Sequence, residues 1–150
     1  MINKSLKSYG IRTDKSMKTV VRLEKAHNKI FSKTLNYLSQ NELTFNQFKV
    51  LEVLYHRGDL SIGAITKLTM STPGNITVVV RNLKRDGYIV SKKDPKDSRS
   101  TIQTITQKGS EIIEAIFPEH AKNLTQICEV LSDEELDTLY ELVNKLYKAN

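Results

Sequence analysis

Signals for the start and end of helices recur at short intervals from residue 44 onward, and they restrict this part of the chain to short helices. Thr44 and Gln47 have the spacing of a capping box, in which each side chain binds a backbone N–H group of the first turn. Gly58 is placed to end that helix, because glycine readily adopts the positive φ found after a helix C-terminus. Ser61 can cap a second helix of about two turns.

A third short helix is predicted after residue 70. Ser71 or Thr72 can serve as its N-cap, and Pro73 fits the first helical position because the N–H group it lacks would have no partner there. Gly87 is placed to end it. Four aliphatic residues at helical spacing form the side that we expect to be buried: Ile76, Val79, Val80 and Leu83.

A two-stranded hairpin is predicted next. Residues 88–93 are β-branched and aromatic at their start and basic at their end, residues 94–98 have turn composition, and residues 99–105 form the returning strand. Three short helices followed by a hairpin are the order of a winged helix-turn-helix. The predicted class is therefore mainly α (α+β), with this lobe over about residues 44–106.

Longer amphipathic helices are predicted on both sides of this lobe. Apolar residues recur at helical spacing over residues 16–38 and again over residues 136–146, where Ser132 and Glu135 form a second capping box. The helix that starts after Thr106 contains Pro118, so we expect a kink there or a break before it. These stripes favour core or interface packing over a cofactor site, and the absence of a repeat or linker favours one domain, 1–150.

Charge is sorted along the chain, within a net charge of +6. Residues 1–34 hold nine basic and two acidic side chains, and residues 71–110 hold eight and three. Residues 111–150 instead hold three basic and nine acidic side chains. A basic lobe with a separate acidic end is typical of a nucleic-acid binder with its own association region.

Several classes of function are disfavoured. No apolar run is long enough for a membrane span and no signal peptide is evident, so a cytoplasmic protein without membrane contact is expected. We find no phosphate-binding loop, nucleophile elbow or metal-ligand spacing, so neither an enzyme nor a cofactor nor a metal is predicted. The single Cys128 lies on an apolar stripe without a basic neighbour, which favours an inert thiol over a redox sensor.

A helix that starts at Thr72 with small residues on its exposed first turn can enter the major groove of DNA. Asn75 and Thr77 are candidates for reading bases, Thr72 and Val78 for contacting thymine methyl groups, and Arg81 for a guanine edge or a phosphate. The basic turn from Lys92 to Arg99 would follow the DNA backbone. The complete candidate set is Ser71, Thr72, Gly74, Asn75, Thr77, Val78, Arg81, Lys84, Lys92, Lys93, Lys96, Asp97 and Arg99.

At these residues the sequence resembles the MarR-type transcriptional regulators. The shared stretches are 43–48, 58–61, 71–78 and 81–89, and the most specific is the wing Asp94-Pro-Lys-Asp-Ser-Arg99, followed by Ile105-Thr106 and Gly109. Two departures are minor: Ile105 stands where leucine is usual, and Gln103 stands where an apolar residue is common.

The resemblance implies a homodimer that binds a pseudo-palindromic operator in double-stranded DNA and is released by a small ligand or an oxidant. Its dimerisation helices would lie in about residues 1–40 and 107–150. Arg99 would enter the minor groove, and Asp97 would steady it by an ion pair. Repression is the commoner mode of regulation in this family. The alternative is a winged helix that binds a protein through the same surface, which would not require the clustered cations.

The family also implies a small-molecule effector bound between the outer helices and the reading head. Apolar and aromatic side chains that could stack on a phenolic or quinone-like compound are Phe31, Phe48, Tyr55 and Phe117. The runs 116–120 and 74–77 are similar to those of a quinone-responsive branch of the family. The sequence names neither the effector nor the operator.

Overall fold

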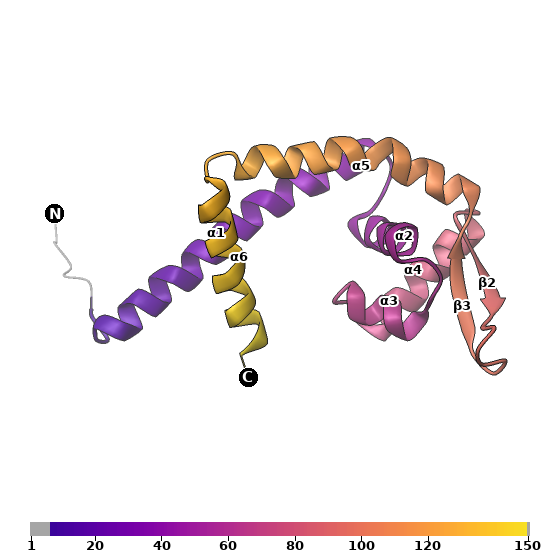
Figure 1. Ribbon diagram of the computed structural model, residues 1–150, viewed down its shortest axis with the longest axis horizontal. Helices are drawn as coiled ribbons and strands as arrows, with labels where there is room; N and C mark the ends of the chain where they lie inside the picture. The colour runs from indigo at the N-terminus through magenta and orange to yellow at the C-terminus, as the bar shows by residue number, and fades with distance from the viewer. Residues whose placement is uncertain (1–6, 150) are drawn as a thin grey trace.

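The computed structural model describes residues 7–149, which form a winged-helix lobe flanked by long helices (Figure 1). The elements in chain order are α1 (Ile11–Gln40), α2 (Phe45–Arg57), β1 (Leu60–Ser61), α3 (Ile62–Leu68), α4 (Pro73–Arg85), β2 (Ile89–Lys93), β3 (Thr101–Ile105), α5 (Gln107–Cys128) and α6 (Asp133–Lys148). The predicted fold class is confirmed.

The helix starts are capped as the sequence predicts. The Thr44 side chain accepts the N–H of Gln47 and the Gln47 side chain accepts the N–H of Thr44, which completes the capping box. Thr72 is the N-cap of α4, and Gly58 has a φ of 83°. These local bonds satisfy N–H groups that would otherwise lack partners, so they fix where the lobe helices begin.

The sheet has three strands instead of the two predicted. β2 and β3 form the expected antiparallel hairpin, and β1 adds to the other side of β3 with Leu60 opposite Gln103 and Ser61 opposite Ile102. The two residues of β1 are too few to show an alternating pattern, and their partner strand β3 is distant in the sequence, so no local signal predicts this pairing. Gln103 is 1% exposed, and its side-chain oxygen accepts the hydroxyl of Ser91 at 2.8 Å. This bond satisfies a polar group in a position where the family commonly has an apolar one.

A single apolar core lies under the lobe and reaches the outer helices. It joins the buried faces of α2, α3 and α4 to β2, to the C-terminal part of α1 and to the first half of α5. The largest apolar side chains that are fully buried are Leu38, Leu51, Leu54, Ile65, Ile76, Leu83, Ile89 and Ile113. Burial of this surface is the dominant stabilising contribution and holds α4 in a fixed position.

α5 continues through Pro118, so of the kink or break that the sequence predicts there, the break does not occur. Proline removes one backbone hydrogen bond, but the turns on either side remain anchored by tertiary contacts. Ile113 and Ile116 are buried, and the carbonyl of Ile116 accepts the Tyr37 hydroxyl from α1 at 3.0 Å. The helix therefore arches over the lobe as one element (Figure 1).

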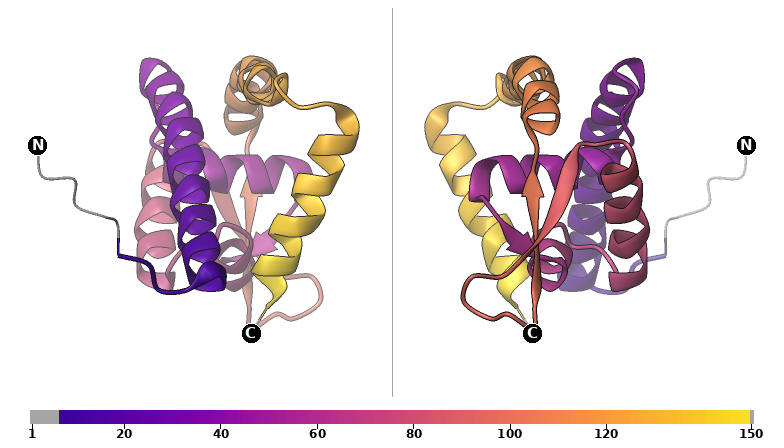
Figure 2. Two further views of the ribbon diagram at one scale, coloured as in Figure 1. Left: turned by 90° about the vertical axis from the view of Figure 1, so that its left-hand side faces the viewer. Right: turned by 90° about the vertical axis from the view of Figure 1, so that its right-hand side faces the viewer.

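The N-terminal half of α1 and all of α6 project from the lobe on the same side (Figures 1 and 2). α6 has a strong apolar stripe but no buried residue. Tyr140 is 66% exposed and Leu146 61%, while on α1 Val20 is 61% exposed. None of the helices between residues 7 and 149 is both long and apolar enough to cross a bilayer.

Candidate nucleic-acid interface

α4 presents one buried and one exposed face. Ile76, Val79, Val80 and Leu83 pack into the core, as the sequence predicts. The opposite face carries the exposed candidate residues Thr72, Gly74, Asn75, Thr77, Val78, Arg81 and Lys84. A helix whose polar face and N-terminus are both open to solvent has the shape required to enter a major groove.

The first turn of α4 is ordered by its own side chains. The Thr72 hydroxyl accepts the N–H of Asn75 at 3.3 Å, and the Thr77 hydroxyl donates to the carbonyl of Pro73 at 2.8 Å. The hydroxyl of Ser71 is turned toward Lys49 and Thr69 instead of toward solvent. Ser71 therefore belongs to the turn before α4, whereas Asn75 keeps an exposed side chain.

In the wing, residues 89–105, the acidic side chains accept hydrogen bonds from backbone and hydroxyl groups of the wing itself. The carboxylate of Asp94 accepts the N–H of Lys96 at 2.8 Å and the hydroxyl of Ser100 at 3.4 Å. The carboxylate of Asp97 accepts the backbone N–H of Arg99 at 3.0 Å. The ion pair expected between the Asp97 and Arg99 side chains is not among those formed by residues 7–149.

The basic side chains of the wing remain open to solvent. Lys92, Lys93, Lys96 and Arg99 are exposed, and within the described chain none of them forms a salt bridge. Because both carboxylates accept backbone N–H groups of the turn and form no ion pair within residues 7–149, the cations are left available to an external anion. Such an arrangement suits the phosphates and the narrow minor groove of a duplex.

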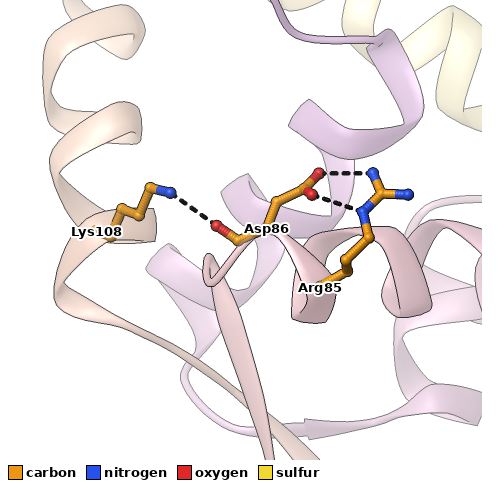
Figure 3. A network of polar contacts seen from close by, with 3 residues as sticks. All are labelled: Arg85, Asp86 and Lys108. Carbon is orange, nitrogen blue, oxygen red and sulfur yellow. Dashed lines mark hydrogen bonds and ion pairs between the residues drawn. The ribbon is translucent and has the colours of Figure 1, made fainter.

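The C-terminal end of α4 is tied to the start of α5 (Figure 3). Arg85 donates to the carboxylate of Asp86 through Nε at 2.8 Å and through a terminal nitrogen at 3.2 Å. These bonds lower the pKa of Asp86. Lys108 donates to the Asp86 carbonyl at 2.8 Å and lies over the Tyr88 ring at 4.6 Å. Arg85 is therefore already paired, whereas Arg81 and Lys84 form no ion pair within residues 7–149.

Three of the four predicted effector residues meet between α2 and α5. The Phe48 ring lies 4.9 Å from the His120 ring, and the Phe117 ring lies 4.7 Å from His56 and 6.0 Å from His120. Tyr55 packs on His56 at 5.1 Å. We call Phe48, Tyr55, His56, Phe117 and His120 the aromatic cluster.

Acidic side chains border the aromatic cluster. The Tyr55 hydroxyl donates to Glu114 at 3.3 Å, and His56 Nδ1 lies 3.3 Å from Glu52 Oε1. Burial lowers the pKa of His120, while the charge of Glu52 opposes that shift. Neither His56 nor His120 is among the predicted effector residues, because the two lie on different helices and have no metal-ligand spacing in the sequence.

Phe31 lies in a different group from the aromatic cluster. It stacks on His27 at 5.6 Å and meets Phe45 edge-on at 4.8 Å. Ring contacts between Phe31 and the other three predicted effector residues do not occur in the described structure. Cys128, at the end of α5, is partly buried. Residues 7–149 contain no group of three or more His, Cys, Asp and Glu side chains that could hold a metal ion.

Together, the helix-turn-helix, the basic wing and the three-stranded sheet define a winged-helix protein with an exposed basic surface. The family model described as transcriptional regulator SarA/Rot matches residues 29–116. The HTH-type regulator MhqR of Bacillus subtilis is 33% identical over 134 residues, which cover 89% of this chain and 92% of MhqR.

Solved structures share the fold over most of their length. A MarR-like regulator from Bacillus cereus has a TM-score of 0.75 and 25% identity, and the match covers 89% of this chain and 96% of that one. NadR, solved in complex with 4-hydroxyphenylacetate, has a TM-score of 0.75 and 21% identity over all of both chains. The chain belongs to the MarR-type family of transcriptional regulators.

Proposed function

We propose that this regulator is a homodimeric repressor that binds a pseudo-palindromic operator and leaves it when a small aromatic compound binds. The observation that carries the DNA contact is the wing, where Asp94 and Asp97 bind the backbone and four cations stay exposed. On the DNA, α4 would lie in the major groove and Arg99 in the adjacent minor groove.

A second copy of the chain is the proposed occupant of the projecting apolar surface. The face between α1 and α6 holds an open groove of about 430 Å³ that is lined by Leu23, Ala26 and Leu139, with Lys18 and Arg22 among its other residues. α6 carries five acidic residues between 133 and 141, and the exposed side of α1 is basic. Charge complementarity between α1 of one copy and α6 of the other supports pairing at this face.

Pairing also gives the DNA contact its geometry. Two reading helices related by a two-fold axis meet half-sites about 34 Å apart, which is one turn of the duplex. An operator with that symmetry would contact both copies of α4 and both wings at once. The proposed binding to a two-fold symmetric operator therefore requires the dimer.

The aromatic cluster is the proposed effector site. Its rings contact one another, so a flat aromatic compound would have to separate α2 from α5 in order to stack between them. α2 packs against α4 and against α5, so such a separation would displace the reading helix. The fold is shared with NadR, which was solved in complex with the phenol 4-hydroxyphenylacetate.

Binding of the purified chain to double-stranded DNA, measured from low to physiological salt, tests the DNA contact. If each copy contacts four phosphates, log K should fall with log salt at a slope of about −7. The molecular mass in the same buffer should be twice that of the chain. No binding at low salt would contradict the proposal and would favour a protein-binding winged helix.

The effector site has a separate test. Hydroquinone and 4-hydroxyphenylacetate, each titrated into the protein–DNA complex, are the probes, and release of DNA by either one supports the site. His120→Leu should weaken that release while DNA affinity without the probe changes little, because the His120 ring contacts Phe48 and Phe117 and an apolar side chain can keep that packing without contact to DNA. Release that is identical in both proteins would place the effector elsewhere.

A further inference from the structure

The turn that leads into α4 has an unusual backbone. Met70 has a φ of 51°, in the left-handed region that glycine usually occupies. The N–H of Met70 donates to the carbonyl of Lys67 at 3.3 Å and the N–H of Ser71 to that of Thr66 at 3.1 Å. This is a Schellman-type helix end with a methionine in the position that glycine usually occupies, and the left-handed backbone is less favourable for a residue with a Cβ atom than for glycine.

Lys49, from α2, supports this turn. Its ammonium group donates to the carbonyl of Thr69 at 2.8 Å and to the hydroxyl of Ser71 at 3.2 Å. These two residues flank Met70, so one charged group binds both sides of the left-handed residue. Hydrogen bonds from an ionised donor are stronger than neutral ones, which suits this task.

Lys49 is itself held in place. Its ammonium lies over the ring of Phe45, one turn earlier on α2, at 5.0 Å from the ring centre. The side chain is half-buried, and burial lowers its pKa. Thr69 is 2% exposed, and its hydroxyl donates to the carbonyl of Ile65. The ammonium therefore faces the interior of the turn and is hydrogen-bonded there, in contrast to the exposed cations of the wing.

The turn decides how α4 begins. Thr72, the N-cap of α4, follows Ser71 directly, and the first exposed turn carries Gly74, Asn75 and Thr77. A change of backbone at Met70 would tilt this first turn relative to α2 and the rest of the core. The residues that would face the bases lie closest to it, so they would shift most.

We propose that Lys49 is a positioning residue for base recognition: it clamps the left-handed turn at Met70 and so aims the first turn of α4, without touching DNA. This inference rests on the proposed DNA-binding function. In this proposal, overall affinity for DNA and discrimination between sequences are carried by different residues. Exposed lysines and arginines would attract any duplex, whereas Lys49 would set the discrimination between one sequence and another.

The test uses a duplex that the unaltered chain selects from a random-sequence pool, together with a shuffled duplex of the same length. In Lys49→Met, preference for the selected duplex should fall about tenfold or more. Affinity for the shuffled duplex and the salt slope should stay the same, because no phosphate contact is lost. Lys122→Met removes an equal charge from the exposed side of α5 and should change neither quantity.

A second substitution checks the cause. Met70→Gly relieves the left-handed turn, so placed in Lys49→Met it should restore much of the discrimination. Lys49→Arg, which keeps a charged donor, should retain most of it. If Lys49→Met does not fold, Lys49→Gln takes its place, because its amide keeps an N–H donor without the charge.

Several outcomes would overturn the inference. A salt slope that falls by about one unit in Lys49→Met would show a direct phosphate contact. Unchanged discrimination in Lys49→Met, or no restoration by Met70→Gly, would remove the positioning role while the proposed function stands. Failure of the unaltered chain to bind either duplex would overturn the proposed function, and the inference with it.

Discussion

The backbone of Gly109 lies directly against the carbonyl group of Tyr88, so closely that a Cβ atom at position 109 would overlap the carbonyl oxygen. Thr106 completes the junction, because its hydroxyl contacts the carbonyls of Gly87 and Tyr88 at 2.7 and 3.0 Å and accepts the N–H of Gly109. The start of α5 is thereby fixed to the turn between α4 and β2. This contact gives a physical reason for the threonine and glycine that the sequence shares with its family.

We expect Gly109→Ala to destabilise the protein by about 1–3 kcal/mol, as overpacking at a rigid contact does. The added Cβ would also meet Ile105 Cγ1 at 2.8 Å, so the strand end and the helix would have to move apart. Gly63→Ala is the control: its Cβ would meet only the Ser61 hydroxyl at 3.9 Å. Urea unfolding of both variants decides the point, and equal stabilities would contradict it.

Arg99→Ala should weaken DNA binding by about 1–3 kcal/mol and leave the melting temperature nearly unchanged. Arg99 is exposed and its side chain forms no ion pair within residues 7–149, so the fold does not depend on it. Arg85→Ala is the matched control, since that guanidinium is bound to Asp86 and should matter less for DNA. Operator affinity that survives Arg99→Ala at physiological salt would refute the wing assignment.

Leu139→Glu and Leu146→Glu should each halve the molecular mass in solution. They place a charge on the α6 stripe, where Leu139 is 42% and Leu146 61% exposed in a single copy, and burial of that charge against a partner is unfavourable. Leu68→Glu, at a 47% exposed leucine on α3, is the control and should leave the mass unchanged. Light scattering at micromolar concentration provides the measurement, and three identical masses would count against the α1–α6 interface.

Stability should fall as the pH drops below about 6.5, in part because of His120. Burial lowers the pKa of its imidazole in the folded state, so the unfolded chain takes up the proton first and is favoured as the pH falls. The stabilising contribution is complete above the unfolded pKa and declines below it. His120→Gln should show a shallower change of melting temperature between pH 8 and 5 than the unaltered chain, with Glu52 still present in both. Parallel curves would contradict this assignment.

The sequence by itself determined the local structure. Caps such as Thr44 and Ser132 act within three residues, and the apolar stripe of α4 follows from helical spacing, so element starts and buried faces could be predicted without knowledge of the fold. The exposed face of α4 and the basic wing could be predicted in the same way from local sequence. Their chemistry is carried by contiguous residues.

Only the tertiary structure decided the relationships between distant segments. Leu60 pairs with Gln103, Lys49 reaches Thr69, and His56 meets Phe117 across helices far apart in the chain. No periodicity records such contacts, because each depends on how the core packs one helix against another. For the same reason Pro118 fits within a continuous helix: contacts from α1 and the core outweigh the hydrogen bond that proline removes.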